Sequence, residues 1–335
     1  MQLSRLASLY TPEQASFATV YLEGRSPGED AADQVRLRWH ELRERLTKEG
    51  ASEEALGSVD EALSQDKAGE EQADGRVLVA SGEGRLALDQ PWDAALGAGD
   101  QAYWGPFPEL GSYVRHTADA VRVLLVVADQ QEARFSAVTV ATEGDAAEDS
   151  TPPQEGGSAP HRRVRHRSAT VVDQNAEDFD TTATDALRRT SPDLVVLAGE
   201  VQGRATLRSR MPDPLSVPLV ETDRGGVTDS RARHVLDEEL LQLATGHAQQ
   251  KQRDDASRFH EAEGHRNTVQ GSDQVLEAAE SGALDMVFRE AGTAAGQEAR
   301  ILGAAARSGA GFALVPHGTG LAGGVAGILR FSPGG

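Results

Sequence analysis

Two short apolar runs in the middle of the chain set the class of fold. Val121 to Ala128 and Leu194 to Gly199 are almost wholly apolar, and each is far too short to cross a bilayer as a helix. A strand covered by helices on both faces reads as such a run, because both of its sides are buried. A helix-like segment from about Asp173 to Arg189 lies between them, so the order strand, helix, strand predicts an α/β layer. The side chains that we expect to be buried in this sheet are Val123, Leu125, Val195 and Leu197.

The 335 residues suffice for two or three compact domains, and the pattern predicts three. The expected fold class is α/β in the α+β sense: an N-terminal α/β domain over residues 1–117, a central domain with a mixed sheet over 118–265, and a small C-terminal α/β/α domain over 266–335. Within the central domain, residues 143–167 are expected to form a mobile loop, because their first part is rich in Asp, Glu, Pro and Gly and cannot bury enough apolar area.

Local patterns add further elements. Alternation predicts a strand at Phe17–Leu22, and an apolar stripe predicts a helix from Ala31 to Thr47. The segments 76–80 and 84–88 predict a hairpin around Ser81-Gly82-Glu83. A long helix is expected from Ser230 to about Glu263, and it becomes very polar after Gly246.

The charge and cysteine counts exclude several classes of function. A formal net charge of −20 disfavours indiscriminate nucleic-acid binding by the whole surface, because phosphates repel such a field. The absence of cysteine excludes disulfides, thiolate metal sites and cysteine nucleophiles. No apolar run approaches the ~18–20 residues of a membrane span, and the first residues lack a secretory pattern, so we expect a cytoplasmic protein without a membrane partner.

Motifs for small ligands are weak. Gly318 to Gly323 matches the dinucleotide spacing, but that fingerprint must follow a strand and open a helix, so a glycine-rich turn is the better interpretation and no cofactor is expected. The histidines at 161, 166, 260 and 265 have no spacing typical of metal ligands, and we predict no metal site. The acidic candidates for acid–base work with them, Asp129, Asp173 and Asp178, are better explained as surface charges or helix caps.

The densest basic cluster of the chain is the best candidate for contact with RNA. Seven consecutive residues hold four arginines and two histidines, in a chain that is otherwise acidic: His161, Arg162, Arg163, Val164, Arg165, His166 and Arg167. Guanidinium groups bind phosphate in a planar, bidentate way. The alternative is a solvated charge run that pairs with the acidic segment before it.

Three segments resemble the archaeo-eukaryotic class 1 release factors. Gly271 to Asp285 is similar to the start of their third domain, and Gly323 to Phe331 is similar to their glycine-rich approach to a final "isoleucine–leucine–arginine–aromatic" strand. Leu194 to Gly199 resembles their "leucine–alanine–glycine" strand. The resemblance covers about residues 118–331 and implies a three-domain, release-factor-like architecture. More narrowly, the chain resembles the bacterial branch common in actinobacteria, which includes the ribosome hibernation factor Balon.

The resemblance also implies where chemistry would occur. In this family a loop-to-helix region before the Leu194–Gly199 strand holds the catalytic Gly-Gly-Gln, which reaches the peptidyl transferase centre. The nearest match here is Gly156, Gly157 and Ser158. Serine is shorter than glutamine and lacks its amide, and Pro160 removes a backbone donor. We therefore expect no catalytic residue, and the two glycines would still permit a close approach to RNA.

The implied partners are the ribosomal A site with its RNA and elongation factor Tu. The function expected from these features is non-catalytic binding to the ribosome, as in hibernation under stress. One alternative is a peptidyl-tRNA hydrolase for ribosome rescue or peptide release. Another is an interaction module whose acidic faces meet basic ribosomal proteins or a translation factor.

Overall fold

The computed structural model describes most of the chain. The residues described are 1–10, 16–22, 31–65, 75–92, 100–129, 132–142, 162–173, 179–211, 215–224, 230–293 and 295–331. The chain divides into two compact units: unit 1 holds Met1–Ala118, Glu143–His161 and Gln252–Gly335, and unit 2 holds Asp119–Thr142 and Arg162–Lys251. In the part of the chain just given, no helix is long and apolar enough to cross a bilayer.

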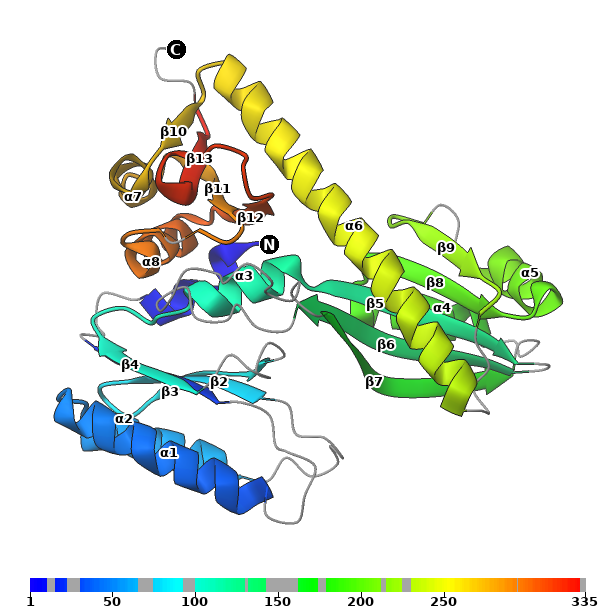
Figure 1. The fold of residues 1–335 in the computed structure, drawn as a ribbon, viewed down its shortest axis with the longest axis horizontal. Helices are drawn as coiled ribbons and strands as arrows, with labels where there is room; N and C mark the ends of the chain where they lie inside the picture. The colour runs from blue at the N-terminus through cyan, green and yellow to red at the C-terminus, as the bar shows by residue number, and fades with distance from the viewer. Residues whose placement is uncertain are drawn as a thin grey trace, which may run out of the picture. The chain divides into compact units, whose positions relative to one another are not determined.

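Unit 2 is built on a mixed five-stranded sheet (Figure 1). The strand order is β7-β6-β5-β8-β9, in which β5, β6 and β7 pair antiparallel and β5, β8 and β9 pair parallel. The strands are β5 (Val121–Asp129), β6 (Glu132–Thr142), β7 (Arg162–Asp173), β8 (Leu194–Gly199) and β9 (Leu219–Thr222). Because β5 and β8 run parallel, the chain must return between them, and the helix α4 (Phe179–Thr190) makes this return.

Helices cover both faces of this sheet. The first part of α6 (Ser230–Gly264) lies on one face through Leu236, Leu240 and Ala244, and it crosses the front of the sheet in Figure 1. On the other face pack α4 and α5 (Val201–Arg210), with Phe179 and Leu207 fully buried. The predicted burial is confirmed: the exposed fractions of Val123, Leu125, Val195 and Leu197 are 0%, 2%, 0% and 0%.

Unit 1 contains two sheets. The N-terminal part of the chain forms an antiparallel sheet of order β3-β2-β1-β4. Its strands are β1 (Phe17–Leu22), β2 (Gly75–Ser81), β3 (Leu86–Trp92) and β4 (Gln101–Gly105), and the helices α1 (Ala31–Lys48) and α2 (Glu53–Ser64) cover one face. A shared apolar core of Trp39, Leu46, Leu56 and Leu78 holds these helices on the strands.

The C-terminal sheet has the order β10-β13-β11-β12, and only β11 and β12 pair parallel within it. Its strands are β10 (Thr268–Gln270), β11 (Leu284–Glu290), β12 (Gly311–Val315) and β13 (Val325–Leu329), with a short 3-10 turn η2 (Ala322–Gly324) before β13. The helices α7 (Ser272–Glu280) and α8 (Glu298–Ser308) pack on one face, and Phe259 from the end of α6 packs on the other. The mixed class of helix and sheet predicted from the sequence is confirmed.

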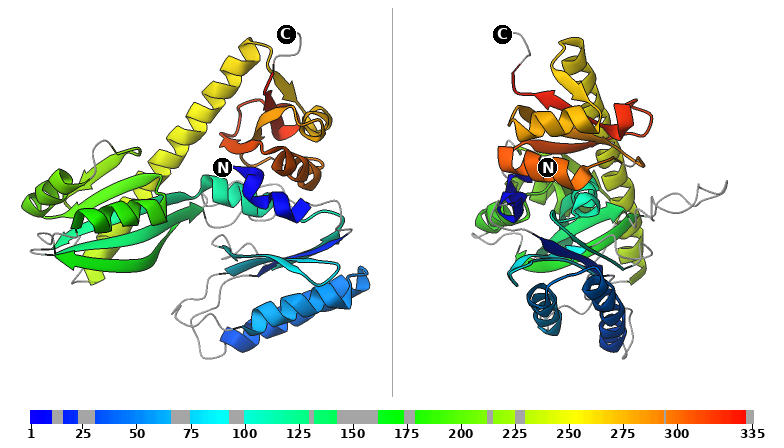
Figure 2. Two further views of the ribbon diagram at one scale, coloured as in Figure 1. Left: turned by 180° about the vertical axis from the view of Figure 1, so that it is seen from behind. Right: turned by 90° about the vertical axis from the view of Figure 1, so that its left-hand side faces the viewer.

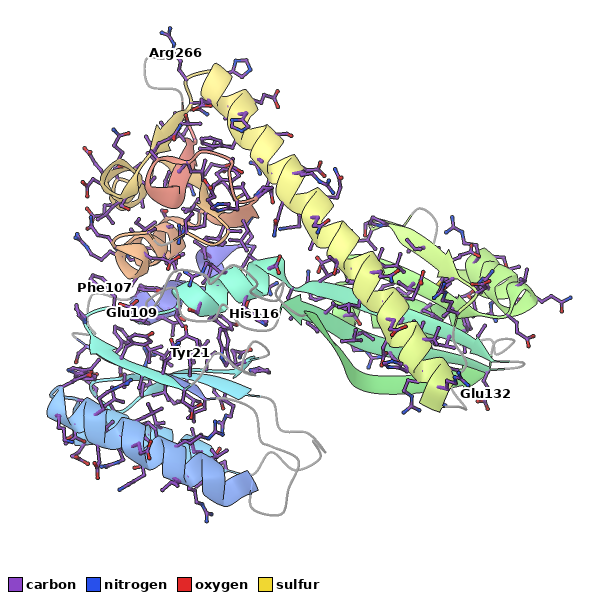
Figure 3. The ribbon with its side chains drawn as sticks, viewed as in Figure 1. Tyr21, Phe107, Glu109, His116, Glu132 and Arg266 are labelled. Carbon is purple, nitrogen blue, oxygen red and sulfur yellow. The ribbon has the colours of Figure 1, made fainter. Side chains whose placement is uncertain are left out.

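The two parts of unit 1 share one apolar core. The 3-10 segment η1 (Leu3–Tyr10) contributes Leu3 and Leu6, and helix α3 (Gly111–Asp119) contributes Val114, to the same apolar cluster as α7 and α8. Figure 3 shows Tyr21 beside the segment that carries Phe107 and Glu109, and the Tyr21 hydroxyl donates to the backbone oxygen of Glu109 at 2.7 Å. Figure 2 shows the ribbon of the N-terminal and C-terminal parts of unit 1 from behind and from the side.

An ion-pair chain crosses this shared core. The Glu298 carboxylate, at the start of α8, pairs with Arg115 of α3 and, at 3.0 Å, with Nε of Arg289 on β11. Arg289 is 1% exposed, and its guanidinium also donates to the backbone oxygen of Gly324 at 2.7 Å. A buried guanidinium is tolerated because each of its polar edges has an acceptor.

Candidate functional site

The predicted loop residues Gly156, Gly157, Ser158 and His161 lie outside the described residues. Their connection is nevertheless defined at both ends. β6 ends at Thr142 and β7 begins at Arg162, and these two residues are directly paired across the antiparallel ladder. Residues 143–161 therefore join two neighbouring strand ends of unit 2.

The rest of the basic cluster lies on a strand and not in a loop. The backbone of Arg162, Arg163, Arg165, His166 and Arg167 belongs to β7, with Arg162 opposite Thr142 and Arg167 opposite Ala137. The prediction of a mobile loop through residue 167 is thus wrong for residues 162–167. Composition suggested a loop, but pairing along the whole length of β6 satisfies the backbone of β7, and half-buried Val164 packs on the core beneath α6.

β7 is an edge strand, because it has β6 on one side and no strand on the other within the described sheet. Charged side chains are common on edge strands, since they discourage unwanted pairing with other chains. An open strand edge is also accessible to an RNA backbone, so the edge position of β7 does not argue against the predicted RNA contact. The location therefore keeps the basic cluster as the candidate contact for phosphate.

The release-factor resemblance implies one connection that both carries the glycine pair and leads into a helix, but in this structure these are two different connections. The Gly156-Gly157 pair falls between two strands, β6 and β7, whereas the connection that leads from a strand into helix α4 is residues 174–178, Gln-Asn-Ala-Glu-Asp. The two connections join opposite ends of the sheet, because Arg162 begins β7 and Asp173 ends it. Glu132, which pairs with Asp173 and is labelled in Figure 3, marks the second end.

Charge is divided unequally between the two units. The sequence ranges of unit 2 hold 15 Arg and Lys against 17 Asp and Glu, a formal charge of −2. The remaining −18 of the total −20 falls in the ranges of unit 1, which hold 18 basic and 36 acidic residues. A polyanion is repelled far less by a nearly neutral unit than by a strongly acidic one. Net charge therefore opposes contact with a polyanion less in unit 2 than in unit 1.

An ion pair between Arg122 and Asp193 joins β5 to the start of β8, at the end of the unit 2 sheet where β7 begins. Arg122 of β5 donates Nε and a terminal guanidinium nitrogen to the two carboxylate oxygens of Asp193, at 3.1 and 3.0 Å. Burial acts to raise the pKa of Asp193, but the hydrogen bonds from the side chain and backbone of Arg122 outweigh it and leave this pKa below its usual value. The pair therefore remains charged at neutral pH.

The glycine-rich segment in unit 1 encloses a side chain of the protein itself. It passes from β12 over the end of β11 to β13, and Glu290, the last residue of β11, lies beneath it. The Glu290 carboxylate accepts backbone N–H groups from Gly318 at 2.7 Å, Leu321 at 3.0 Å and Gly320 at 3.2 Å. Gly318 and Gly320 have φ values of 83° and 85°, which glycine adopts without strain.

This arrangement explains the glycine spacing without a cofactor. In a dinucleotide site the backbone N–H groups point at a phosphate, whereas here the same kind of group is taken by Glu290. Burial acts to raise the pKa of Glu290, but the three hydrogen bonds outweigh it and hold the pKa below its usual value. The motif is a loop anchor, and the carboxylate that it encloses could not be found from spacing alone.

Among the residues that the structure describes, no group of three or more His, Cys, Asp or Glu could hold a metal ion. His260 lies on α6 with Nδ1 at 3.4 Å from Glu263, an ordinary surface contact three residues along the helix. Asp129 and Asp173 end β5 and β7, respectively, and Asp178 lies outside the described residues. His161 also lies outside the described residues, so the prediction of no metal site and no acid–base centre at these positions stays a prediction.

Sequence reasoning missed the buried Arg289 network. Arg289 follows the apolar residues Met286, Val287 and Phe288 in strand Leu284–Glu290, and an arginine is fully buried only when it is paired. A charged residue directly after this apolar run was the signal available in the sequence. Its partners, Glu298 and Gly324, are separated from it by nine and 35 residues, and no local pattern connects them.

Comparison with known proteins places the likeness in the central region. Residues 122–265 match the model of bacterial archaeo-eukaryotic release factor family 2. The uncharacterized protein Rv2629 of Mycobacterium tuberculosis is 24% identical over 253 residues, which cover 72% of this chain and 63% of that protein. The chain thus matches less than two thirds of the length of this relative.

Solved structures of low sequence identity also align. Archaeoglobus fulgidus Pelota covers 99% of this chain and 92% of its own, with 11% identity and a TM-score of 0.33. A ribosome-bound archaeal Pelota gives 98% and 93% coverage, 12% identity and a TM-score of 0.45, and Saccharomyces cerevisiae Dom34 gives 70% and 74%, 12% and 0.41. The family match confirms the release-factor resemblance for the central region.

Proposed function

We propose that this chain, whose residues 122–265 match a release-factor family, is a translation factor that binds the ribosome in the A site without hydrolysing peptidyl-tRNA. The observation that carries the proposal is that the matched residues, 122–265, include almost all of unit 2, the unit with nearly zero net charge. The same unit carries the basic strand β7. A family relation and a surface suited to RNA thus fall on the same residues.

The separation of the two loop features supports a non-catalytic role. The connection that enters α4 contains Gln174 but no glycine, and the Gly156-Gly157 pair is followed by Ser158 in a connection between strands. Close approach of backbone to an ester requires glycine, and orientation of a water requires a side chain in the right place. Neither connection offers Gly-Gly-Gln.

We further propose that the chain acts in the cytoplasm, in the narrower setting of ribosome hibernation under stress, in the actinobacterial branch of the family. Elongation factor Tu is the proposed delivery partner. An acidic protein is steered poorly toward RNA, so association aided by a partner protein would compensate for the charge of −20.

The test is ribosome pelleting with purified protein, with and without elongation factor Tu, combined with release of labelled peptide from peptidyl-tRNA on the ribosome. We expect co-sedimentation that the factor increases, and release no faster than the background. Peptide release at the rate of an active termination factor would favour the alternative, a rescue hydrolase. Failure to pellet under both conditions would refute the proposal.

A further inference from the structure

We propose that Arg188 and Arg189, in the last turn of α4, form a second contact for RNA phosphate groups at the end of the unit 2 sheet where strand β7 begins. The inference rests on the proposed function, because it assumes that unit 2 meets RNA. It adds two residues that lie outside the basic cluster in sequence, 21 positions or more beyond Arg167. The ligand class is the phosphate backbone, bound through guanidinium groups.

The topology brings the end of α4 to the end of the sheet where β7 begins. Across the sheet, Val164 of β7 pairs with Val140, and Val140 pairs with Val121 at the start of β5. β8 begins beside β5, with Leu194 opposite Val123. α4 ends at Thr190, only four residues before β8 begins, so its last turn lies at this same end.

The contacts of the two side chains are weak. Arg188 has 76% of its side chain exposed and lies 3.3 Å from Asp185, which is itself 49% exposed and three positions earlier on the helix. Arg189 is also exposed, and its Nε donates to the backbone oxygen of Asp185 at 3.4 Å. Exposed pairs of this kind contribute about 0.3–0.5 kcal/mol, so an incoming phosphate can replace them at little cost.

Three other arginines of unit 2, Arg122, Arg204 and Arg210, are held more firmly. Arg122 is bound by both oxygens of Asp193, and Arg204 donates to the backbone oxygen of Gly199 at 2.8 Å and lies 3.6 Å from Glu221. Arg210 pairs with Asp180 at 3.1 Å, and its guanidinium lies 4.5 Å from the centre of the Phe179 ring. These groups serve the fold, whereas Arg188 and Arg189 are presented to solvent.

Arginines at positions 188 and 189 have a second explanation that involves no RNA, because they lie at the C-terminal end of a helix. Positive side chains in a last turn interact with the helix dipole, typically by 0.3–1 kcal/mol. That effect predicts a small loss of stability when the charges are removed and no effect on RNA. The two explanations therefore differ in what a binding experiment measures.

The experiment compares the native chain with Arg188→Gln/Arg189→Gln and with a matched control, Arg231→Gln/Arg233→Gln. Both control residues are exposed in the first turn of α6. The control residues lie at the other end of the sheet. His247, on the same helix, is close enough to Asp193 to lower its pKa, and Arg233 precedes His247 by 14 residues, which is about 21 Å along a helix. Binding is measured by co-sedimentation with 70S ribosomes and by fluorescence anisotropy with a 20-base-pair RNA duplex, each over a salt series.

We expect the α4 variant to bind ribosomes roughly tenfold or more weakly near 0.1 M salt, with the slope of log affinity against log salt reduced by about 1.5 for two contacts. The control should keep the native slope, and both variants should melt within about 2 °C of the native chain. Equal behaviour of the α4 variant and the control on ribosomes would overturn the inference and leave the proposed function standing.

The duplex arm separates the two proposals. If the native chain fails to pellet with ribosomes but the α4 variant alone loses affinity for the duplex, the α4 contact is supported and the proposed function falls. If the native chain binds neither ribosomes nor the duplex, both are refuted.

Discussion

Arg122 and Asp193 exchange backbone and side-chain hydrogen bonds at the point where two parallel strands begin. The Asp193 N–H donates to the backbone oxygen of Arg122 at 2.7 Å, and the Arg122 N–H donates to Oδ2 of Asp193 at 2.9 Å. The two carboxylate oxygens then bind the guanidinium. Parallel strands have no hairpin turn to set their register, so this pair fixes how β5 and β8 align.

The first prediction is that Asp193→Asn lowers the stability of unit 2 by about 1.5–3 kcal/mol at pH 7, the range for hydrogen bonds to charged groups. The folded pKa of Asp193 is lower than its unfolded value, which is near 3.9. Its stabilisation is therefore complete above that unfolded value and disappears as the pH falls through the folded pKa.

The difference in stability between native and variant should accordingly be constant above about pH 5 and shrink as the pH falls below the unfolded pKa of Asp193, near 3.9. Urea unfolding followed by circular dichroism, with hydrogen exchange of β5 and β8, measures it. The control is Asp185→Asn on α4, where 49% of the side chain is exposed, and this variant should change stability by less than about 0.5 kcal/mol. A difference independent of pH would contradict the assigned role of the charge.

The second prediction concerns the loop anchor. Glu290→Gln replaces one acceptor oxygen by an amide NH₂, which then faces backbone donors, so we expect unit 1 to lose about 2–4 kcal/mol. All three tryptophans, Trp39, Trp92 and Trp104, belong to unit 1, so their fluorescence follows its unfolding. Glu280→Gln, at a carboxylate that is 51% exposed, is the control and should be nearly neutral. Equal losses in both variants would remove the special role of Glu290.

The third prediction pairs two glycines with opposite outcomes. Gly199 has φ of 112°, and a Cβ there would lie 2.4 Å from the backbone oxygen of Ala128, so Gly199→Ala should destabilise unit 2 by about 2–4 kcal/mol. Gly246 lies in the interior of α6, with nothing within 4 Å of the added carbon, so Gly246→Ala should stabilise by about 0.5–1 kcal/mol. Thermal melts decide both, and the same sign for the two variants would contradict the backbone argument.

The fourth prediction is that Ser158→Gln restores little peptide release. The substitution supplies the missing amide but does not alter Pro160 or move the segment from the β6–β7 connection to the connection that enters α4. Positioning within about 1 Å governs such a reaction. The assay is single-turnover release of labelled peptide, with the native chain as the baseline. Release restored to the level of an active termination factor would show that residues 156–158 are a functional loop.

The fifth prediction concerns the basic strand. Changing Arg162, Arg163, Arg165 and Arg167 together to glutamine should weaken ribosome binding strongly and reduce the salt slope by roughly 0.7–0.9 for each phosphate contact removed. Ribosome co-sedimentation over a salt series measures it. Hydrogen exchange of β6 and β7 serves as the control for an intact hairpin. An unchanged slope would mean that these residues are solvated charges and that the RNA contact lies elsewhere.

Many individual helices and strands were predictable, because the spacing of apolar side chains within each segment determines them. Alternation places a strand at Phe17–Leu22, where it is observed, and the apolar stripe predicts a helix over 31–47 that is found as Ala31–Lys48. The long helix expected from Ser230 to about Glu263 ends at Gly264. The hairpin expected at 76–80 and 84–88 is found as Gly75–Ser81 and Leu86–Trp92.

The structural features that the sequence did not predict depend on contacts between residues far apart in the chain. The helix expected from about Asp173 begins only at Phe179, because β7 occupies residues 162–173. That strand exists through its ladder to β6, and no property of Arg162 to Arg167 alone reveals a ladder. The pairing of Arg115 with Glu298, 183 residues apart, likewise lay beyond any local pattern. The boundaries of the three expected domains and the roles of residues 156–158 stay predictions.

The direct pairing of Thr142 with Arg162 has a consequence for how this protein can vary among organisms. Paired residues on adjacent strands lie about 5 Å apart, so the segment between them starts and ends at almost the same place. The entropy of closing such a segment grows only with the logarithm of its length, about 0.6 kcal/mol for each doubling. Residues can therefore be gained or lost here over generations while the sheet keeps its register.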